Sequence, residues 1–156
     1  MDDIDRKICE IMQHDGRTSS AAIAEALSIP TSTANDRLRK LSANGTIRGW
    51  HAALDPEHAG ASLACFVLID MDYTGESEAV GILCTRPEVM ELHHISGAHS
   101  YLMKLRIEGM QALETFLTDI VKPISAIRRT ETIFAMKTYK ETSEILITSV
   151  VEKGLK

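Results

Sequence analysis

Residues 19–45 read SSAAIAEALSIPTSTANDRLRKLSANG, and this stretch predicts two short helices joined by a tight turn. Apolar side chains recur at helical spacing over 21–27 and again from Ala34 to Leu41, which gives each helix one apolar face. Between them, Pro30 excludes the preceding residue from the helical backbone region, and Asn44-Gly45 is a typical helix end. Two short amphipathic helices with such a turn are the pattern of a helix-turn-helix.

The second helix of this pair turns a polar, basic surface away from its apolar face. A helix that reads DNA in the major groove needs hydrogen-bonding side chains for base edges and Arg or Lys for phosphates. We therefore expect Arg37, Arg39 and Lys40 to lie on phosphates and the shorter polar side chains to face the bases. The candidate DNA-binding residues are Thr31, Ser32, Thr33, Asn35, Asp36, Arg37, Arg39 and Lys40. The alternative interpretation is the solvated face of an ordinary helical hairpin.

The distribution of charge supports a DNA partner, although the chain carries a net charge of −5. Residues 31–50 hold four basic side chains against one acidic side chain, which is the footprint expected over a phosphate backbone. Acidic residues concentrate after residue 54. DNA would repel that second half, so we expect it to lie away from the duplex.

Length and composition place the chain among small water-soluble proteins. Its 156 residues fit one domain or two small ones. No apolar run approaches the ~20 residues needed to cross a bilayer, and the acidic N-terminus is unlike a signal peptide. Cys9, Cys65 and Cys84 are odd in number and lie in apolar surroundings, which is typical of reduced thiols. We therefore expect a cytoplasmic protein without a membrane partner.

The second half of the chain alternates between strand and helix patterns. A nearly continuous apolar run over 62–71 and clean alternation over 101–107 both predict strands. The expected order is a strand over 62–71, a helix from 75 to before Pro87, strands over 89–95 and 101–107, a helix over 113–121 and a strand over 126–140. This is the ferredoxin-like βαββαβ arrangement, one antiparallel sheet with two helices on one face. The other face needs a partner, most simply a second copy of the chain.

Three further segments complete the expected organisation. Isoleucines at helical spacing predict a first helix over 2–14 that packs on the helix pair. Residues 46–52, with Trp50 as a packing anchor, predict a small wing or a linker strand, and the tail over 145–151 fits a strand or a helix. We expect an α+β protein with a winged-type helix-turn-helix domain over 1–52, a linker over 53–60 and a ferredoxin-like ligand-sensing and oligomerisation domain over 61–156.

The sequence contains no constellation that indicates a catalytic or metal centre. His93, His94 and His99 cluster in the sequence, but adjacent histidines on a strand point to opposite faces. No cysteine or carboxylate stands beside them at zinc-like spacing. The serines lack a nucleophile elbow, and the glycines form no phosphate-binding fingerprint. We therefore expect no enzymatic activity, no cofactor and no metal.

Short motifs along the whole chain carry a family resemblance. They are Asp15-Gly16-Arg17-Thr18-Ser19, Leu38-Arg39-Lys40-Leu41, Asn44-Gly45-Thr46-Ile47, Leu54-Asp55-Pro56, Ser96-Gly97 leading to Tyr101-Leu102, and Lys137-Thr138 or Lys140 after the last strand. With a helix-turn-helix followed by a βαββαβ module, they resemble the Lrp/AsnC (leucine-responsive, or feast/famine) transcription regulators. The resemblance implies a bacterial or archaeal regulator that binds double-stranded DNA, forms homodimers through its sheets and often assembles into octamers.

The resemblance also implies an effector, usually an amino acid, held between dimers near the glycine turn before the third strand. Carried over by position, the effector-binding residues are Gly97, Ala98, His99, Ser100, Tyr101, Met110, Ile133, Phe134 and Ala135. The family turn commonly carries an aspartate just before the tyrosine, able to hold an ammonium group. This chain has Ser100 there, which supplies no charge. The alternative interpretation of the turn is a plain β-hairpin connection.

Together these observations predict a sequence-specific DNA-binding transcriptional regulator that responds to an amino acid or a related small metabolite. A second interpretation is an effector-binding or scaffolding oligomer whose helix-turn-helix makes protein contacts instead of specific DNA contacts. A small enzyme built on the ferredoxin-like module is a third interpretation, without a catalytic constellation to support it.

Overall fold

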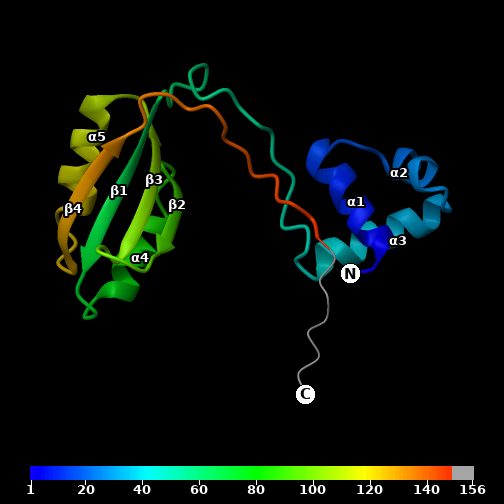
Figure 1. Cartoon of the computed structure of the whole chain (residues 1–156), viewed down its shortest axis with the longest axis horizontal. Coiled ribbons are helices and arrows are strands. Elements are labelled where there is room, and N and C mark those ends of the chain that lie inside the picture. Colours follow the sequence, from blue (N-terminus) through cyan, green and yellow to red (C-terminus); the bar gives the residue numbers. More distant parts are fainter. Residues whose placement is uncertain (149–156) are drawn as a thin grey trace. The chain divides into compact units, whose positions relative to one another are not determined.

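The computed structural model of the chain describes residues 1–148 and divides into two compact units (Figure 1). Of the described residues, the first unit comprises Met1–Ala53 and 142–148, and the second unit is Leu54–Glu141. Each unit has its own hydrophobic core. Within the described residues, no helix is both long enough and apolar enough to cross a bilayer.

Three helices form the first unit: α1 (Asp3–His14), α2 (Ser20–Leu27) and α3 (Thr31–Ala43). Ile8, Ile23, Ala34 and Leu41 are buried in one core, as the spacing of apolar residues predicts. The core therefore fixes which side of α3 is free to face outward.

Local backbone chemistry sets the ends of these helices. The hydroxyl of Ser19 accepts the hydrogen bond that caps the start of α2. At the other end, Ser28 adopts a left-handed backbone conformation with φ of 54°, which ends α2 and turns the chain toward α3. Pro30 then stands just before α3, where its fixed φ suits the start of a helix and its missing N–H costs no hydrogen bond. The helix-turn-helix geometry follows from these residues.

The strand expected over residues 46–52 is absent from the structure, which has turns and irregular backbone there. The N–H of Ile47 donates to the carbonyl of Leu41 and so completes the end of α3 instead of a strand pair. Trp50 remains about half exposed, and its ring lies against Gly16. The segment therefore packs on the first unit without forming a wing.

The second unit is a four-stranded antiparallel sheet with helices, the expected ferredoxin-like fold. Its elements are β1 (Leu63–Met71), α4 (Glu76–Cys84), β2 (Val89–His94), β3 (Tyr101–Ile107), α5 (Met110–Phe116), its π-helical continuation η1 (Leu117–Val121) and β4 (Ile127–Phe134). The strand order is β2-β3-β1-β4, and all neighbours are antiparallel. Strands β1 and β3 are therefore central, and β2 and β4 are edges.

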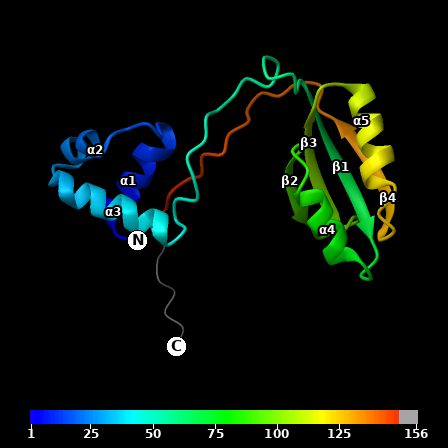
Figure 2. The same cartoon turned by 180° about the vertical axis from the view of Figure 1, so that it is seen from behind.

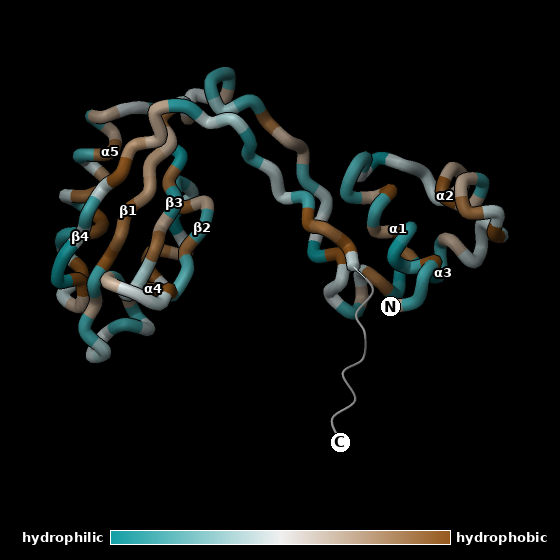
Figure 3. Tube along the Cα trace, viewed as in Figure 1, coloured by the Kyte–Doolittle hydropathy of each residue, from teal (hydrophilic) through white to brown (hydrophobic). Residues whose placement is uncertain are grey.

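Alternate side chains of the central strands enter the core between the sheet and the helices. Cys65, Val67 and Ile69 of β1 are fully buried, as are Met103 and Leu105 of β3. Seen from behind, α4 and α5 cover this face of the sheet (Figure 2). Hydropathy colouring shows β1 as a nearly continuous apolar strand (Figure 3), because its second set of alternate side chains is also largely apolar.

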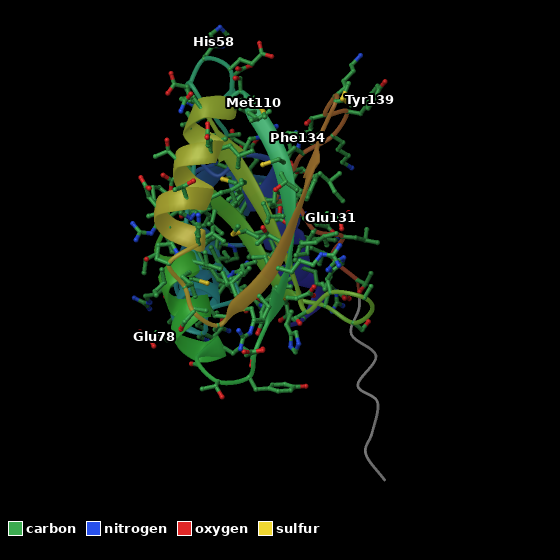
Figure 4. All side chains as sticks on the ribbon, turned by 90° about the vertical axis from the view of Figure 1, so that its left-hand side faces the viewer. His58, Glu78, Met110, Glu131, Phe134 and Tyr139 are labelled. Carbon is green, nitrogen blue, oxygen red and sulfur yellow. The ribbon has the colours of Figure 1, made fainter. Side chains whose placement is uncertain are left out.

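That second set lies on the side of the sheet away from α4 and α5. Residues that pair directly across antiparallel strands share a face, so Phe66 lies beside Ile133, and Leu68 beside Leu102. We call the surface defined by these four side chains the open sheet face. Figure 4 views the unit along the sheet, with the helices on one side and Glu131 of β4 on the other. The open sheet face therefore carries charged side chains beside its apolar ones, with Glu131 on the edge strand β4 and Lys104 of β3 paired with Phe66.

The last strand is shorter than the sequence predicts. It ends at Phe134 rather than near residue 140, because its partner β1 begins at Leu63 and offers no backbone further on. Residues 145–148 form neither a strand nor a helix, and the expectation for 149–151 falls outside the described residues.

The cysteines are free thiols, as expected, but only two of them lie in a core. Cys9 and Cys65 are buried, whereas Cys84 at the end of α4 is exposed, which corrects the expectation for that residue. Burial raises the pKa of the Cys9 and Cys65 thiols, which keeps them protonated and unreactive at neutral pH.

Candidate nucleic-acid interface and effector site

The outward side of α3 carries most of the candidate DNA-binding residues. Its exposed residues include Thr31, Ser32, Asn35, Asp36, Arg39 and Lys40. Thr33 is half-buried at the flank, and Ala34 and Leu41 face the core. One helix surface therefore combines hydroxyls, an amide, a carboxylate and two cations, the groups that contact base edges and phosphates. We call this surface the α3 polar row.

Arg37, which the sequence groups with Arg39 and Lys40 as a phosphate contact, lies outside the α3 polar row. Its Nη1 atom donates to carboxylate oxygens of Asp2 at 2.6 Å and Asp5 at 2.7 Å, and only 27% of the side chain is exposed. These bonds raise the pKa of Arg37. The pKa of Asp2 is lowered by the Asp5 N–H and then by the Arg37 guanidinium. Arg37 therefore holds α3 against α1.

Arg39 is the exposed arginine of the α3 polar row, and it pairs with Asp36 one helical turn earlier. Its Nη2 atom lies 2.8 Å from the Asp36 carboxylate, with 80% and 60% of the two side chains exposed. An ion pair this exposed contributes little stability in water. The guanidinium can therefore leave Asp36 for a phosphate at small cost.

The candidate effector residues form two groups near opposite ends of the sheet. The turn before β3 lies at the end of β1, where the N–H of Ser100 donates to the carbonyl of Ile69 at 3.1 Å. Phe134 instead pairs with Cys65, near the start of β1. At ~3.3 Å per residue, the two groups are about 13 Å apart along β1, so one chain does not bring them together. The first group is Gly97, Ala98, His99, Ser100 and Tyr101, and the second is Met110, Ile133, Phe134 and Ala135.

Tyr101 points its ring into the layer between the sheet and the helices. Only 8% of the residue is exposed, its hydroxyl donates to Glu76 at 2.9 Å, and its ring stacks on His94 with centroids 4.8 Å apart. Burial, followed by the Glu76 carboxylate, raises the pKa of Tyr101. The ring is therefore a structural element of the second unit. At this position the turn has only backbone groups available to contact a ligand.

His99 lies between two carboxylates that come from other strands. Its Nδ1 atom is 3.2 Å from the Asp70 carboxylate of β1, and its Nε2 atom is 3.9 Å from the Glu131 carboxylate of β4. Negative charge is thus present beside the turn, although Ser100 supplies none. Sequence reasoning missed Asp70 and Glu131 in this role because only the register of β1 with its neighbours brings them to the turn.

Two members of the second group, Met110 and Phe134, line a groove along the edge strand β4, whereas Ile133 lies on the open sheet face. The groove has a volume of about 490 Å³, and Figure 4 shows Met110 and Phe134 at the same end of the unit. Its apolar and hydroxyl side chains suit the body of a small organic molecule. Met110 of α5 was among the expected effector-binding residues, whereas sequence reasoning missed the other lining residues of α5 and η1. The lining residues are Met110, Gln111, Leu113, Glu114, Leu117, Thr118, Thr132 and Phe134.

Comparison with known proteins matches each unit to a known domain family. The family model described as AsnC-type helix-turn-helix domain matches residues 1–42, and the Lrp/AsnC ligand binding domain matches residues 64–145. The chain is 33% identical over 147 residues to the HTH-type transcriptional regulator FL11 of Pyrococcus horikoshii, covering 94% of this chain and 97% of that protein. It is 31% identical over 150 residues to the DNA-binding transcriptional activator DecR of Escherichia coli, covering 94% and 99%.

Solved structures agree with the fold. An AsnC family transcriptional regulator from Agrobacterium tumefaciens superposes with a TM-score of 0.87 at 29% identity, covering 94% of this chain and 97% of that chain. A transcriptional regulator from Neisseria meningitidis, solved as a complex with L-Met, has the same fold, with a TM-score of 0.87 at 23% identity and coverage of 94% and 96%. The chain belongs to the Lrp/AsnC family of transcription regulators.

Proposed function

We propose that this protein regulates transcription as a homodimer that binds double-stranded DNA through α3 and responds to a small amino-acid-like effector. The observation that carries the proposal is the α3 polar row, which is exposed on the second helix of a helix-turn-helix. Helix-turn-helix proteins place this helix in the major groove, and a dimer reads two half-sites about one helical turn apart.

Within the α3 polar row, the residues divide by chemistry into two roles. Arg39 and Lys40 neutralise phosphates and fix the position of the helix on the duplex. Hydrogen-bonding side chains before them supply the base contacts, with Thr33 reaching from the flank, and they are Thr31, Ser32, Thr33, Asn35 and Asp36. Arg37 supports this helix from behind through α1, so its contribution to DNA binding is indirect.

The open sheet face supports the proposed homodimer. Phe66, Leu68, Leu102 and Ile133 form a central apolar surface on it, and 47% of Ile133 is exposed. A self-complementary contact of this kind generates two-fold symmetry, which a two-fold symmetric DNA site matches. Assembly of such dimers into an octamer is the further proposal that the family resemblance supports.

The effector site in this proposal is completed by two chains. The turn before β3 and the groove beside β4 are separated within one chain, so a contact between chains is needed to bring one chain's turn to another chain's groove. Asp70 and Glu131 place negative charge beside the turn, which suits the ammonium group of an amino acid. The L-Met bound to the Neisseria regulator makes an amino acid the first ligand to test.

We also propose that the protein acts in the cytoplasm without cofactor or enzymatic activity. The free thiols support this compartment. The membership of a family of transcription regulators supports a function in binding rather than in catalysis.

A gel-shift titration with the DNA upstream of the protein's own gene tests the proposal. We expect a shift that survives an excess of unrelated duplex DNA and that at least one amino acid strengthens or weakens. Equal affinity for the unrelated DNA would instead favour an effector-binding or scaffolding oligomer. A specific shift that no amino acid changes would remove the amino acid from the account and leave the DNA-binding function intact.

A further inference from the structure

The side chain of Gln13 in α1 binds the backbone of a residue that follows 132 positions later. Its Nε2 atom donates to the carbonyl of Ile145 at 2.9 Å, and the N–H of Ile145 donates to its Oε1 atom at 3.2 Å. One amide thus satisfies both backbone groups of Ile145, the same exchange of hydrogen bonds that pairs two residues of neighbouring antiparallel strands. The Gln13 side chain therefore binds the chain at Ile145 as a neighbouring strand would.

Apolar packing adds to this attachment two residues further on. Ile147 is partly buried against the core of the first unit, and the remaining described residues between 142 and 148 are exposed. The segment 142–148 therefore contacts the helical unit through one hydrogen-bonded residue and one apolar residue. We call this segment the C-terminal strap.

Immediately before the strap, Glu141 is bound to the second unit. Its carboxylate lies 2.8 Å from Nζ of Lys104 and 2.5 Å from Nη2 of Arg106, both on β3. The Arg106 guanidinium and then the Lys104 ammonium lower the pKa of Glu141 to about 2. Only 16% and 11% of the Lys104 and Arg106 side chains are exposed, so this ion pair is more sheltered than the one between Asp36 and Arg39.

We propose that the C-terminal strap is a structural part of the DNA-binding unit, clipped there by Gln13, and that with Glu141 it forms a second connection between the sheet and the helix-turn-helix. The covalent linker ahead of β1 is the first connection. Through this second connection, a conformational change around Lys104 and Arg106 alters the packing of the strap on α1. Arg37 in turn binds α1 to α3. The strap thereby gives the effector-binding unit a route to the DNA-binding helix.

Two truncations of the full chain test the first part of the proposal by hydrogen–deuterium exchange of the α1 amides, a readout that involves no DNA. We expect the chain ending at Glu141 to exchange on the order of tenfold faster in α1, as loss of two hydrogen bonds and an apolar contact requires. The matched control ends at Thr148, keeps the strap and should exchange like the full chain. Equal exchange in both truncations and the full chain would overturn the proposal.

The substitution Gln13→Ala keeps the test decisive if the shorter truncation folds poorly, because Gln13 is exposed and its loss leaves the core intact. We expect faster α1 exchange in the full chain and no further acceleration when Gln13→Ala is added to the chain ending at Glu141. An equal effect of Gln13→Ala in both backgrounds would show that Gln13 does not act through the strap and would overturn its role as a clip.

The second part of the proposal is tested by Glu141→Gln, which removes the charge that binds the strap to β3. We expect α1 exchange to accelerate, whereas Glu108→Gln, at an exposed position in the same unit, should leave it unchanged. If Glu141→Gln left α1 exchange at the full-chain rate, the strap would not connect the two units, whatever the truncations show.

Discussion

The guanidinium of Arg37 in α3 lies 2.7 Å from the carboxylate of Asp5 in α1, although 32 residues separate them. The same nitrogen also donates to Asp2. Asp2 and Asp5 form a capping box at the start of α1, so one arginine connects that cap with the middle of α3, the proposed DNA-binding helix. The angle at which α3 presents its polar row therefore depends on the start of α1.

The first prediction follows from this contact. Arg37→Ala should lower the midpoint temperature of thermal unfolding of the first unit, because it leaves two adjacent carboxylates without their cation. Thermal unfolding followed by circular dichroism measures this midpoint. The salt dependence of DNA binding should keep its slope, since Arg37 does not contact phosphate. Arg39→Ala is the matched control and should leave the midpoint unchanged. A reduced slope in Arg37→Ala would show that Arg37 contacts a DNA phosphate.

The second prediction concerns acid stability. Because the pKa of Glu141 is about 2 in the folded chain and the ordinary value is 4.5, the unfolded chain binds the proton first as the pH falls. The stabilisation by Glu141 is thus fully present above about pH 4.5 and is lost between pH 4.5 and 2. Urea unfolding should show Glu141→Gln as less stable than the natural chain at pH 7 and nearly equal to it at pH 2. A difference that is constant over this range would contradict the ion pair.

The third prediction concerns the proposed homodimer. Leu68→Asp places a charge at the centre of the open sheet face, where burial of an unpaired carboxylate is unfavourable, so sedimentation should show monomers and DNA affinity should fall. Tyr73→Asp, at a residue that is 95% exposed in the loop after β1, should leave the assembly unchanged. Dimers that persist in Leu68→Asp would place the contact on another surface.

The fourth prediction separates structure from ligand binding at Tyr101. Tyr101→Phe removes the hydrogen bond to Glu76 and should cost about 1 kcal/mol in the free energy of unfolding. Because the ring faces the helices, the response of DNA binding to the effector should not change. Loss of that response at unchanged stability would show that the hydroxyl contacts the ligand.

Local sequence patterns predicted the elements of this fold well. Apolar periodicity gave all three helices of the first unit and the order of strands and helices in the second, because each element buries a face that its own residues define. The strand over 101–107 has the expected bounds, since its alternation is complete. Where an element depends on a distant partner, prediction was weaker, as for the end of β4, which β1 determines.

The site was predicted less completely for the same reason. The α3 polar row follows from the face that α3 buries, which the sequence shows directly. The role of Arg37 depends on Asp2 and Asp5, the surroundings of His99 depend on strand register, and the binding of Ile145 by Gln13 spans nearly the whole chain. No local pattern carries these three contacts.

The salt dependence of DNA affinity for Arg39→Ala and Lys40→Ala tests the central claim most directly, namely that the α3 polar row binds phosphates. Each lost phosphate contact should reduce the slope of log affinity against log salt by about 0.9, or about 1.8 for the two copies in a dimer. Lys122→Ala, at an exposed residue of the other unit, should keep the slope of the natural chain. We expect both α3 variants to show the reduced slope, and slopes equal to that of Lys122→Ala would contradict the account.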